Sequence, residues 1–231
     1  MHETLAGVEL YTVDLRAEGH PWESWVADLA PAERARADRF AFPEGRRRFV
    51  VGRVTLRRLM GSRLGVPAAE VQLIDGAHGK PALAPCHDAI ANGLSFNLTH
   101  SGELALIALG RGDLGVDLES PLRAVDAMAV VRRFFSETER NGFESIPVGA
   151  DRDRLFFRVW TRKEALVKAV GRGLSCPLSS FTVPIGDLPP EGVRIECPEQ
   201  SGRRWRLFEI GSVLHLGADW VASLVVLDDG R

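Results

Sequence analysis

The feature that most constrains the fold is a pattern of predicted elements that restarts once, at the turn over residues 110–113. Before it, hydrophobic periodicity predicts a strand over 8–15, helices over 31–39 and 45–64, strands over 71–74, 94–100 and 104–109, and a turn at 78–81. After it, the pattern predicts a strand over 115–119, helices over 126–134, 136–143 and 151–170, and strands over 181–185, 193–197, 204–210 and 220–227. We therefore expect two similar α+β halves, residues 1–112 and 113–231, and the seam between them is a natural place for a ligand cleft.

Composition argues against several classes of protein. The 231 residues are 45% hydrophobic and 26% charged, which is typical of a soluble globular protein. No apolar run approaches the roughly 18 residues of a membrane span, and the first residues lack the features of a signal peptide. A formal net charge of −2 argues against nucleic-acid binding. Three cysteines without a C-x-x-C motif provide neither a disulfide framework nor a zinc site, so we expect a reducing cytoplasm.

Lysine is rare in this chain. Of 29 basic residues only three are lysines, Lys80, Lys163 and Lys168, and the others are arginines. Where arginine serves nearly everywhere, a retained lysine indicates a need for a compact ammonium group instead of a planar guanidinium.

The stretch GVDLES, residues 115–120, places two carboxylates on one face of a predicted strand. Asp117 and Glu119 are two residues apart, and side chains alternate along a strand, so both point the same way. Burial would strengthen their repulsion unless a cation or a proton relieves it. One interpretation is a solvated strand end, and the other is a cation site.

The motif WTRKEALVKAVGRGL, residues 160–174, offers partners for this pair. On a helix, Trp160, Glu164 and Lys168 lie on one face, although a surface Glu–Lys pair beside a core tryptophan would look the same. Three carboxylates from a strand and a helix, Asp117, Glu119 and Glu164, can hold a hard cation such as Mg²⁺. That ion commonly takes its remaining ligands from the phosphates of a substrate.

Cations that could meet such phosphates lie in three other segments. They are Arg48 in the run Arg46–Arg48 with Arg53 one turn later, Lys80 in the turn HGKP, and His100 in FNLTHSG. A solvated helix face and a structural histidine are the alternatives for the arginines and for His100. The chain has no P-loop, G-x-G-x-x-G, G-x-S-x-G or H-E-x-x-H motif. The remaining interpretation is a Mg²⁺ site that binds phosphates without any of these common motifs.

Five motifs in register resemble the Sfp-type 4′-phosphopantetheinyl transferases. They are GKP (79–81), FNLTHSG (96–102), GVDLE (115–119), FFSETE (134–139) and WTRKEALVKAVGRGL (160–174), and they cover most of residues 31–185. The resemblance implies a monomer of two α+β subdomains related by a pseudo-twofold axis, with coenzyme A bound in the cleft between them. It also implies Mg²⁺-dependent transfer of the phosphopantetheine arm to a serine of an apo acyl or peptidyl carrier protein, with release of adenosine 3′,5′-bisphosphate.

The resemblance also implies roles for individual residues. Asp117, Glu119 and Glu164 match the acidic residues around Mg²⁺, and Glu164, Lys168 and Asp117 are the expected catalytic residues. Contacts with coenzyme A are expected from Arg48, Arg53, Lys80, Thr99, His100, Lys163 and Lys168. Glu139 of FFSETE is a second acid in reach by the same analogy, or else an exposed glutamate at a helix start.

Two rival functions stay open at the level of sequence. One is a different Mg²⁺-dependent phosphotransferase, which would use a nucleotide other than coenzyme A. The other is a noncatalytic protein that binds a carrier domain. The sequence does not indicate which carrier proteins are served.

Overall fold

The computed structural model describes residues 2–76, 79–121, 125–173, 176–200, 202–217 and 219–228. Its strands are β1 (His2–Leu5), β2 (Val8–Asp14), β3 (Leu73–Asp75), β4 (Pro81–Leu83), β5 (Leu94–Ser101), β6 (Leu104–Arg111), β7 (Leu114–Glu119), β8 (Val193–Glu196), β9 (Arg204–Glu209) and β10 (Val221–Leu227). Its α-helices are α1 (Pro31–Ala37), α2 (Pro43–Leu64), α3 (Asp88–Ala91), α4 (Ala127–Phe134), α5 (Glu137–Glu144) and α6 (Ala150–Val170), and short 3₁₀ helices include η1 (Trp22–Asp28) and η5 (Leu178–Ser180). Among the described residues, no helix combines the length and apolarity needed to cross a bilayer.

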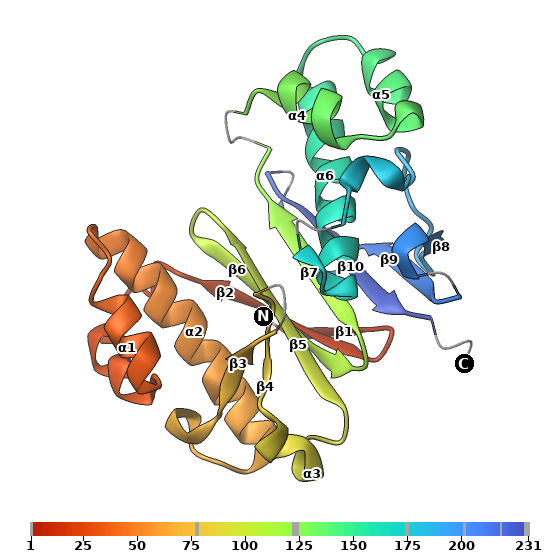
Figure 1. The fold of residues 1–231 in the computed structure, drawn as a ribbon. Coiled ribbons are helices and arrows are strands. Elements are labelled where there is room, and N and C mark those ends of the chain that lie inside the picture. The colour runs from red at the N-terminus through yellow and green to blue at the C-terminus, as the bar shows by residue number, and fades with distance from the viewer. Residues whose placement is uncertain are drawn as a thin grey trace.

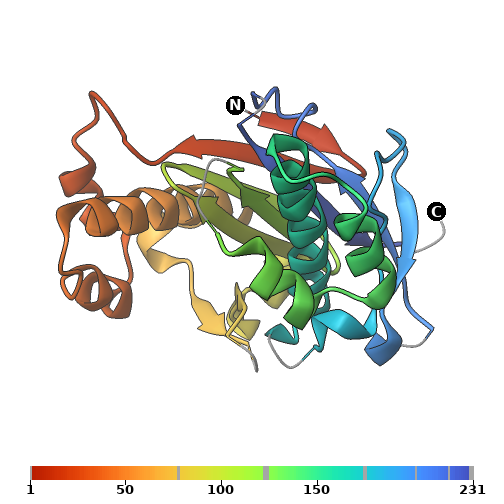
Figure 2. The same ribbon diagram turned by 90° about the horizontal axis from the view of Figure 1, so that it is seen from above.

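The chain forms an α+β fold with two four-stranded antiparallel sheets. The first has the order β1-β2-β6-β5 and the second the order β7-β10-β9-β8, while β3 and β4 form a separate hairpin. Each half also contains one long helix, α2 of 22 residues or α6 of 21 residues. Figures 1 and 2 show the long helices on different halves of the molecule, with the strands of the two sheets meeting between them. A pseudo-twofold relation between the halves stays a prediction.

The hydrophobic core is continuous across the two halves. One cluster packs α2 residues such as Leu56 and Met60 against Ile107 of the first sheet, and another packs α4–α6 against the second sheet. A third cluster contains residues of both sheets, including Leu10 of β2 and Val116 of β7. Because that cluster is buried between the sheets, the halves are held together by apolar packing.

Local signals explain where the two long helices begin and end. Pro43 opens α2, where its missing N–H group costs no helical hydrogen bond. Gly65 ends α2 with φ of 70° and Gly171 ends α6 with φ of 76°. Both glycines adopt the left-handed conformation that favours residues without a Cβ atom.

Gly115 allows β7 to pack directly on the backbone of α6. A Cβ atom at this position would lie 2.2 Å from the carbonyl oxygen of Ala165 and 2.3 Å from the amide nitrogen of Ala169. The glycine of GVDLE is therefore required by this close approach, which brings the carboxylates of β7 beside the helix that carries Glu164 and Lys168.

The structure confirms most of the elements predicted from periodicity, with ends that shift by a few residues. The strand predicted over 181–185 is wrong, because these residues form no strand. Their backbone groups are bound by side chains instead: Glu139 accepts from Val183 N, Lys163 donates to Phe181 O and Arg162 donates to Pro184 O. Strands β1 and β4 were not predicted. His78 of the HGKP turn and Leu174 of the long motif lie outside the described residues.

Gly115→Ala should destabilise the protein by about 2–3 kcal/mol, because the new methyl group can be accommodated only by moving α6 away from β7. Denaturant unfolding would measure this change. Gly217→Ala is the matched control, since a Cβ atom there has no neighbour within 4 Å. Equal stability of the two variants would contradict the proposed contact.

Candidate functional site

Strands β5 and β7 belong to different sheets but lie side by side, joined by side chains. In the described part of the chain, β5 pairs through its backbone with β6, and β7 with β10. Three hydrogen bonds, here called the seam bonds, connect the two strands: Val116 N to Asn97 Oδ1 at 2.8 Å, Thr99 Oγ1 to Asp117 Oδ1 at 3.0 Å, and Ser101 Oγ to Glu119 Oε2 at 2.8 Å. Because residue numbers rise in the same order on both strands, β5 and β7 run parallel at the seam.

The seam bonds explain the alternation in FNLTHSG. Asn97, Thr99 and Ser101 are buried and share one face of β5, whereas His100 on the other face is exposed. The buried face is thus the one that holds the two carboxylates of GVDLE in place.

Lys168 of α6 completes a cluster with Thr99 and Asp117. Its Nζ lies 2.6 Å from Asp117 Oδ1 and 3.1 Å from Thr99 Oγ1. Asp117 Oδ1 therefore accepts from both neighbours, whereas Asp117 Oδ2 is buried and has no hydrogen-bond partner. The structure brings together three residues that the sequence assigned to one site.

Glu164 lies one helical turn before Lys168 on α6 and is half-buried. Burial raises the pKa of its carboxyl above the ordinary value, and the negative charges of Asp117 and Glu119 raise it further. The positive charge of Lys168 acts in the opposite direction. The three predicted acidic residues are therefore close enough to influence one another electrostatically.

The acidic residues fit a hard cation in their chemistry. Asp117 Oδ2 is an orphaned, buried carboxylate oxygen, and oxygen atoms are the ligands that Mg²⁺ prefers. Across the described residues no group of three His, Cys, Asp or Glu side chains is gathered into a metal cluster. In this arrangement Asp117 Oδ1 is bound by Lys168, and Glu119 Oε2 accepts from Ser101.

Positive charge gathers beside this cluster, at the end of β5. Desolvation lowers the pKa of His100, and the charges of Arg48 and Lys168 lower it further. Arg48 donates to Glu103 Oε1 over 2.5 Å, and Arg47 of the same helix also binds Glu103. Three cationic or basic groups from β5, α2 and α6 therefore influence one another here, an arrangement that suits an anion.

Lys80 crosses from the first half to the second. Its Nζ donates to the carbonyl oxygen of Leu114, at the start of β7, over 2.9 Å. A Cβ atom at Gly171 would lie 3.9 Å from Lys80 Cδ, which places this side chain beside the end of α6. Burial lowers the pKa of Lys80, and the charge of Asp113 partly opposes this.

Two side chains that were expected to contact coenzyme A form ion pairs inside the protein. Lys163 is fully buried, forms an ion pair with Glu139 at 2.8 Å and donates to the carbonyl oxygens of Leu178 and Phe181. Its role in this structure is therefore structural, in place of the expected contact with coenzyme A. Arg53 is mostly buried and ion-paired with Glu33 of α1, and its expected contact with coenzyme A stays a prediction.

Glu139 differs from both interpretations of the sequence. It stands at the start of α5, where it forms a capping box with Ser136. It is also fully buried and binds Val183 N and Lys163. It is therefore neither an exposed glutamate nor an acid open to a substrate.

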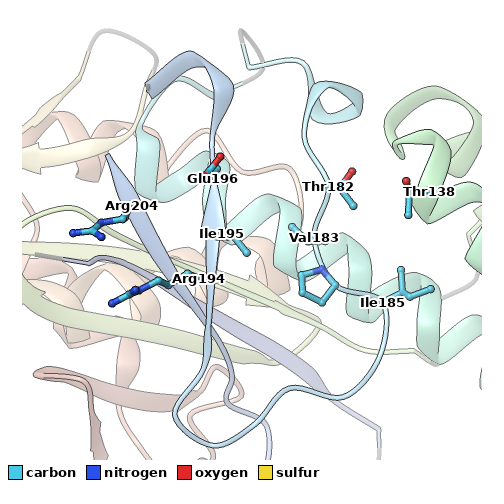
Figure 3. A pocket seen from close by; sticks show the side chains of 9 residues that line it. Thr138, Thr182, Val183, Ile185, Arg194, Ile195, Glu196 and Arg204 are labelled. Atoms are coloured by element: carbon cyan, nitrogen blue, oxygen red, sulfur yellow. The ribbon is translucent and has the colours of Figure 1, made fainter. Parts of the chain in front are cut away.

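Figure 3 shows a cavity of ≈ 560 Å³ between β8 and the segment 182–185. Ile195 of β8 and Val183 face it from opposite sides, and Thr138 of α5 lies at one end. A larger cavity of ≈ 1250 Å³ has lining residues from both halves, including Leu94 of β5 and Phe208 of β9. Neither lining contains a predicted site residue. A ligand cleft next to Asp117 stays a prediction.

Asn97 and Ser101 were missed by the sequence reasoning. The available signal was the i, i+2 spacing of polar side chains in FNLTHSG, which repeats the spacing in GVDLE. Two strands whose polar residues share this period can bind one another side by side, but the sequence did not show which strands are neighbours.

Comparisons with known proteins agree with the motifs. A model described as the 4′-phosphopantetheinyl transferase superfamily matches residues 113–225, and one described as 4′-phosphopantetheinyl transferase, N-terminal, matches residues 16–111. The 4′-phosphopantetheinyl transferase HetI of Nostoc sp. is 36% identical over 205 residues, which are 88% of this chain and 82% of the relative. The transferase Sfp of Bacillus subtilis is 29% identical over 181 residues, covering 77% of this chain and 75% of the relative. The human L-aminoadipate-semialdehyde dehydrogenase-phosphopantetheinyl transferase is 27% identical, over 72% of this chain and 56% of the relative.

Glu164→Gln should stabilise the protein at neutral pH, raising Tm by about 2–4 °C. Because the folded-state pKa of Glu164 is raised, the folded protein binds its proton more tightly than the unfolded chain does. Stability from this group is therefore present at low pH and lost as pH rises through the raised pKa. Thermal unfolding between pH 4 and pH 8 should show a higher Tm for the variant than for the wild type near pH 8 and an equal Tm near pH 4. An advantage that is constant with pH would contradict the charge repulsion.

Lys163→Met should cost about 3–5 kcal/mol, because it leaves the fully buried Glu139 without its cation. Denaturant unfolding would measure this loss. Arg16→Met is the control, since it breaks an exposed ion pair with Asp14 and should change the stability far less. A loss as small for Lys163→Met as for the control would show that the buried pair is not structural.

Proposed function

Because the chain belongs to the 4′-phosphopantetheinyl transferase superfamily and is an Sfp-type enzyme, we propose that it transfers the 4′-phosphopantetheine arm of coenzyme A to a serine of an apo acyl or peptidyl carrier protein. The proposed reaction requires Mg²⁺ and releases adenosine 3′,5′-bisphosphate. The observation that carries the proposal is the cluster of Lys168, Thr99 and Asp117, with Glu164 beside it and one buried carboxylate oxygen left without a partner.

The basic residues around this cluster support binding of the phosphates of coenzyme A. Lys168 is placed to stabilise charge on the bridging oxygen of the leaving group. Thr99 binds Lys168, and His100 is near enough to Lys168 and to Arg48 to be influenced by both charges; these side chains suit the diphosphate and the 3′-phosphate. Lys80, which already spans the two halves, suits the adenine end of the molecule.

Glu164 is the proposed general base. It lies one helical turn before Lys168 on α6, and the match to the family motif supports a role as base, either directly or through a water molecule. The serine oxygen forms a bond to the β-phosphorus of coenzyme A as the bond from that phosphorus to the bridging oxygen breaks. The serine proton passes to Glu164, and the bridging oxygen leaves with adenosine 3′,5′-bisphosphate.

Asp117, Glu119 and Glu164 are the residues that would hold Mg²⁺. The ion, when bound, supplies Lewis-acid stabilisation of the diphosphate charge. The orphaned Oδ2 atom of Asp117 supports this assignment, because a buried carboxylate oxygen without a partner is costly unless a cation or a donor meets it.

We extend the proposal to the organisation of the chain. Residues 1–112 and 113–231 act as two subdomains of a monomer, with coenzyme A between them. The side chains of Lys80 and Thr99, which reach from the first part to the second, support this arrangement. The free state of Cys86, Cys176 and Cys197 supports a reducing cytoplasm.

Mass spectrometry of apo carrier proteins incubated with coenzyme A, Mg²⁺ and this protein tests the function. We expect the mass of one phosphopantetheine arm on at least one carrier. Asp117→Ala and Glu164→Gln should lower the rate at least about 100-fold, and Lys168→Arg at least about tenfold, because a planar guanidinium does not reproduce the compact ammonium. The control is Asp187→Asn, which changes a highly exposed carboxylate bound to Arg158 and should leave the rate unchanged.

A wild-type rate in Asp117→Ala, or a loss of activity in the control Asp187→Asn, would contradict the assignment of the active site to Asp117, Glu164 and Lys168. The absence of any arm on a panel of polyketide, peptide and fatty-acid carriers would favour the noncatalytic rival. A thermal-shift comparison addresses the other rival: coenzyme A with Mg²⁺ should raise Tm more than ATP with Mg²⁺, because only a bound ligand stabilises the folded state.

A further inference from the structure

We propose that Asn97 is a positioning residue that sets the register of β7 against β5, and through it the placement of Asp117 and Glu119. The inference deepens the proposed function, since it concerns the same site. Asn97 contacts neither of the two carboxylates in the described hydrogen bonds, and it belongs to no group assigned above to metal, substrate or proton transfer.

Asn97 makes a different kind of contact from the other two seam residues. Thr99 and Ser101 bind side-chain oxygens, which can rotate without moving the strand. Asn97 Oδ1 accepts from the backbone N–H of Val116, so its bond holds the strand itself. Asn97 is only 5% exposed and Val116 is fully buried, so water does not offer the N–H group a replacement.

The bond lies at the point where β7 meets its other neighbours. Val116 follows Gly115, which packs on the backbone of α6, and precedes Asp117, which binds Lys168 of the same helix. The seam has no backbone ladder among the described residues, so the seam bonds are the hydrogen bonds that act directly on the displacement of β7 along β5. A small slip would move Asp117 relative to Thr99 and Glu119 relative to Ser101 at the same time.

Three residues of nearly the same shape allow a matched test. Asn97→Leu removes the acceptor and keeps the branched shape with a larger volume, while Asn97→Asp keeps an acceptor oxygen at the same place. The control is Ser223→Ala. Ser223 lies opposite Asp117 on β10 and forms a buried hydrogen bond to Thr161 of α6, so its loss weakens a bond next to β7 that does not cross the seam.

Amide hydrogen exchange by NMR, in the protein without ligands, reports on the bond directly. Asn97→Leu should increase the exchange rate of the Val116 amide at least tenfold, while Asn97→Asp and Ser223→Ala retain its protection. In the carrier-modification assay, Asn97→Leu should lower kcat about 10- to 100-fold, as expected for a site displaced by an ångström or less. Its KM for coenzyme A should change less than threefold, because Arg48 and Lys80 stay in place. Asn97→Asp should fall between wild type and Asn97→Leu.

Several results would overturn the inference. Unchanged Val116 exchange in Asn97→Leu would show that the bond does not hold the strand. An equal loss of kcat in Ser223→Ala at a matched loss of Tm would assign the effect to general stability. If Asn97→Asp had as low a kcat and as fast an exchange of the Val116 amide as Asn97→Leu, the acceptor oxygen at position 97 would have no role. Failure of the wild-type protein to modify any carrier would instead contradict the proposed function. The exchange measurement would still show whether Asn97 holds β7 against β5.

Discussion

The site depends on the hydrogen bonds that join the side chains of β5 to β7. These two parallel strands are edge strands of different sheets, and the described residues contain no backbone ladder between them. The polar side chains of FNLTHSG fill that gap and at the same time orient the carboxylates of GVDLE. One set of contacts therefore joins the two halves of the protein and prepares the acidic side of the site.

The charges at the seam are unbalanced. Asp117, Glu119 and Glu164 lie near one ammonium group, that of Lys168. The pKa of Glu164 is raised mainly by burial, and the charges of Asp117 and Glu119 raise it further. Burying such a group is unfavourable in a protein without its ligand, and folding tolerates it because apolar packing holds the halves together elsewhere. His100, whose lowered pKa favours the neutral ring, and Arg48, which is paired with Glu103, offer N–H donors to an anion near Lys168. The arrangement thus suits a ligand that carries negative charge and is accompanied by a divalent cation.

Sequence reasoning predicted the parts of the fold that depend on local periodicity. The helices α2 and α6 and the strand β7 followed from spacing. The motifs assigned Lys168 and Asp117 to one site, but the ion pair between them was not predicted. The scarcity of lysine suggested a ligand contact for all three lysines. The roles of Lys80 and Lys168 stay predictions, whereas Lys163 is buried and bound within the fold. Lys163 stands five positions before Lys168, which turns its side chain by about 140° around the helix, away from the site and into the core.

Other features depend on contacts between distant segments, which periodicity does not reveal. The segment 181–185 alternates like a strand, yet Arg162 and Lys163 bind its carbonyl oxygens and Pro184 has no N–H to donate. Glu139 stands at a helix start, but its burial follows from Lys163 on another helix. The roles of Asn97 and Ser101 became visible only when β5 and β7 were seen to be neighbours.

A crystal structure of the protein with coenzyme A and Mg²⁺ tests most directly whether the site is made by both halves at this seam. We expect the phosphates to contact Lys168 of α6 together with His100 or Arg48 of the first half, with the seam bonds unchanged. Coenzyme A bound by one half alone, or in the cavity beside β8 that Figure 3 shows, would contradict the account.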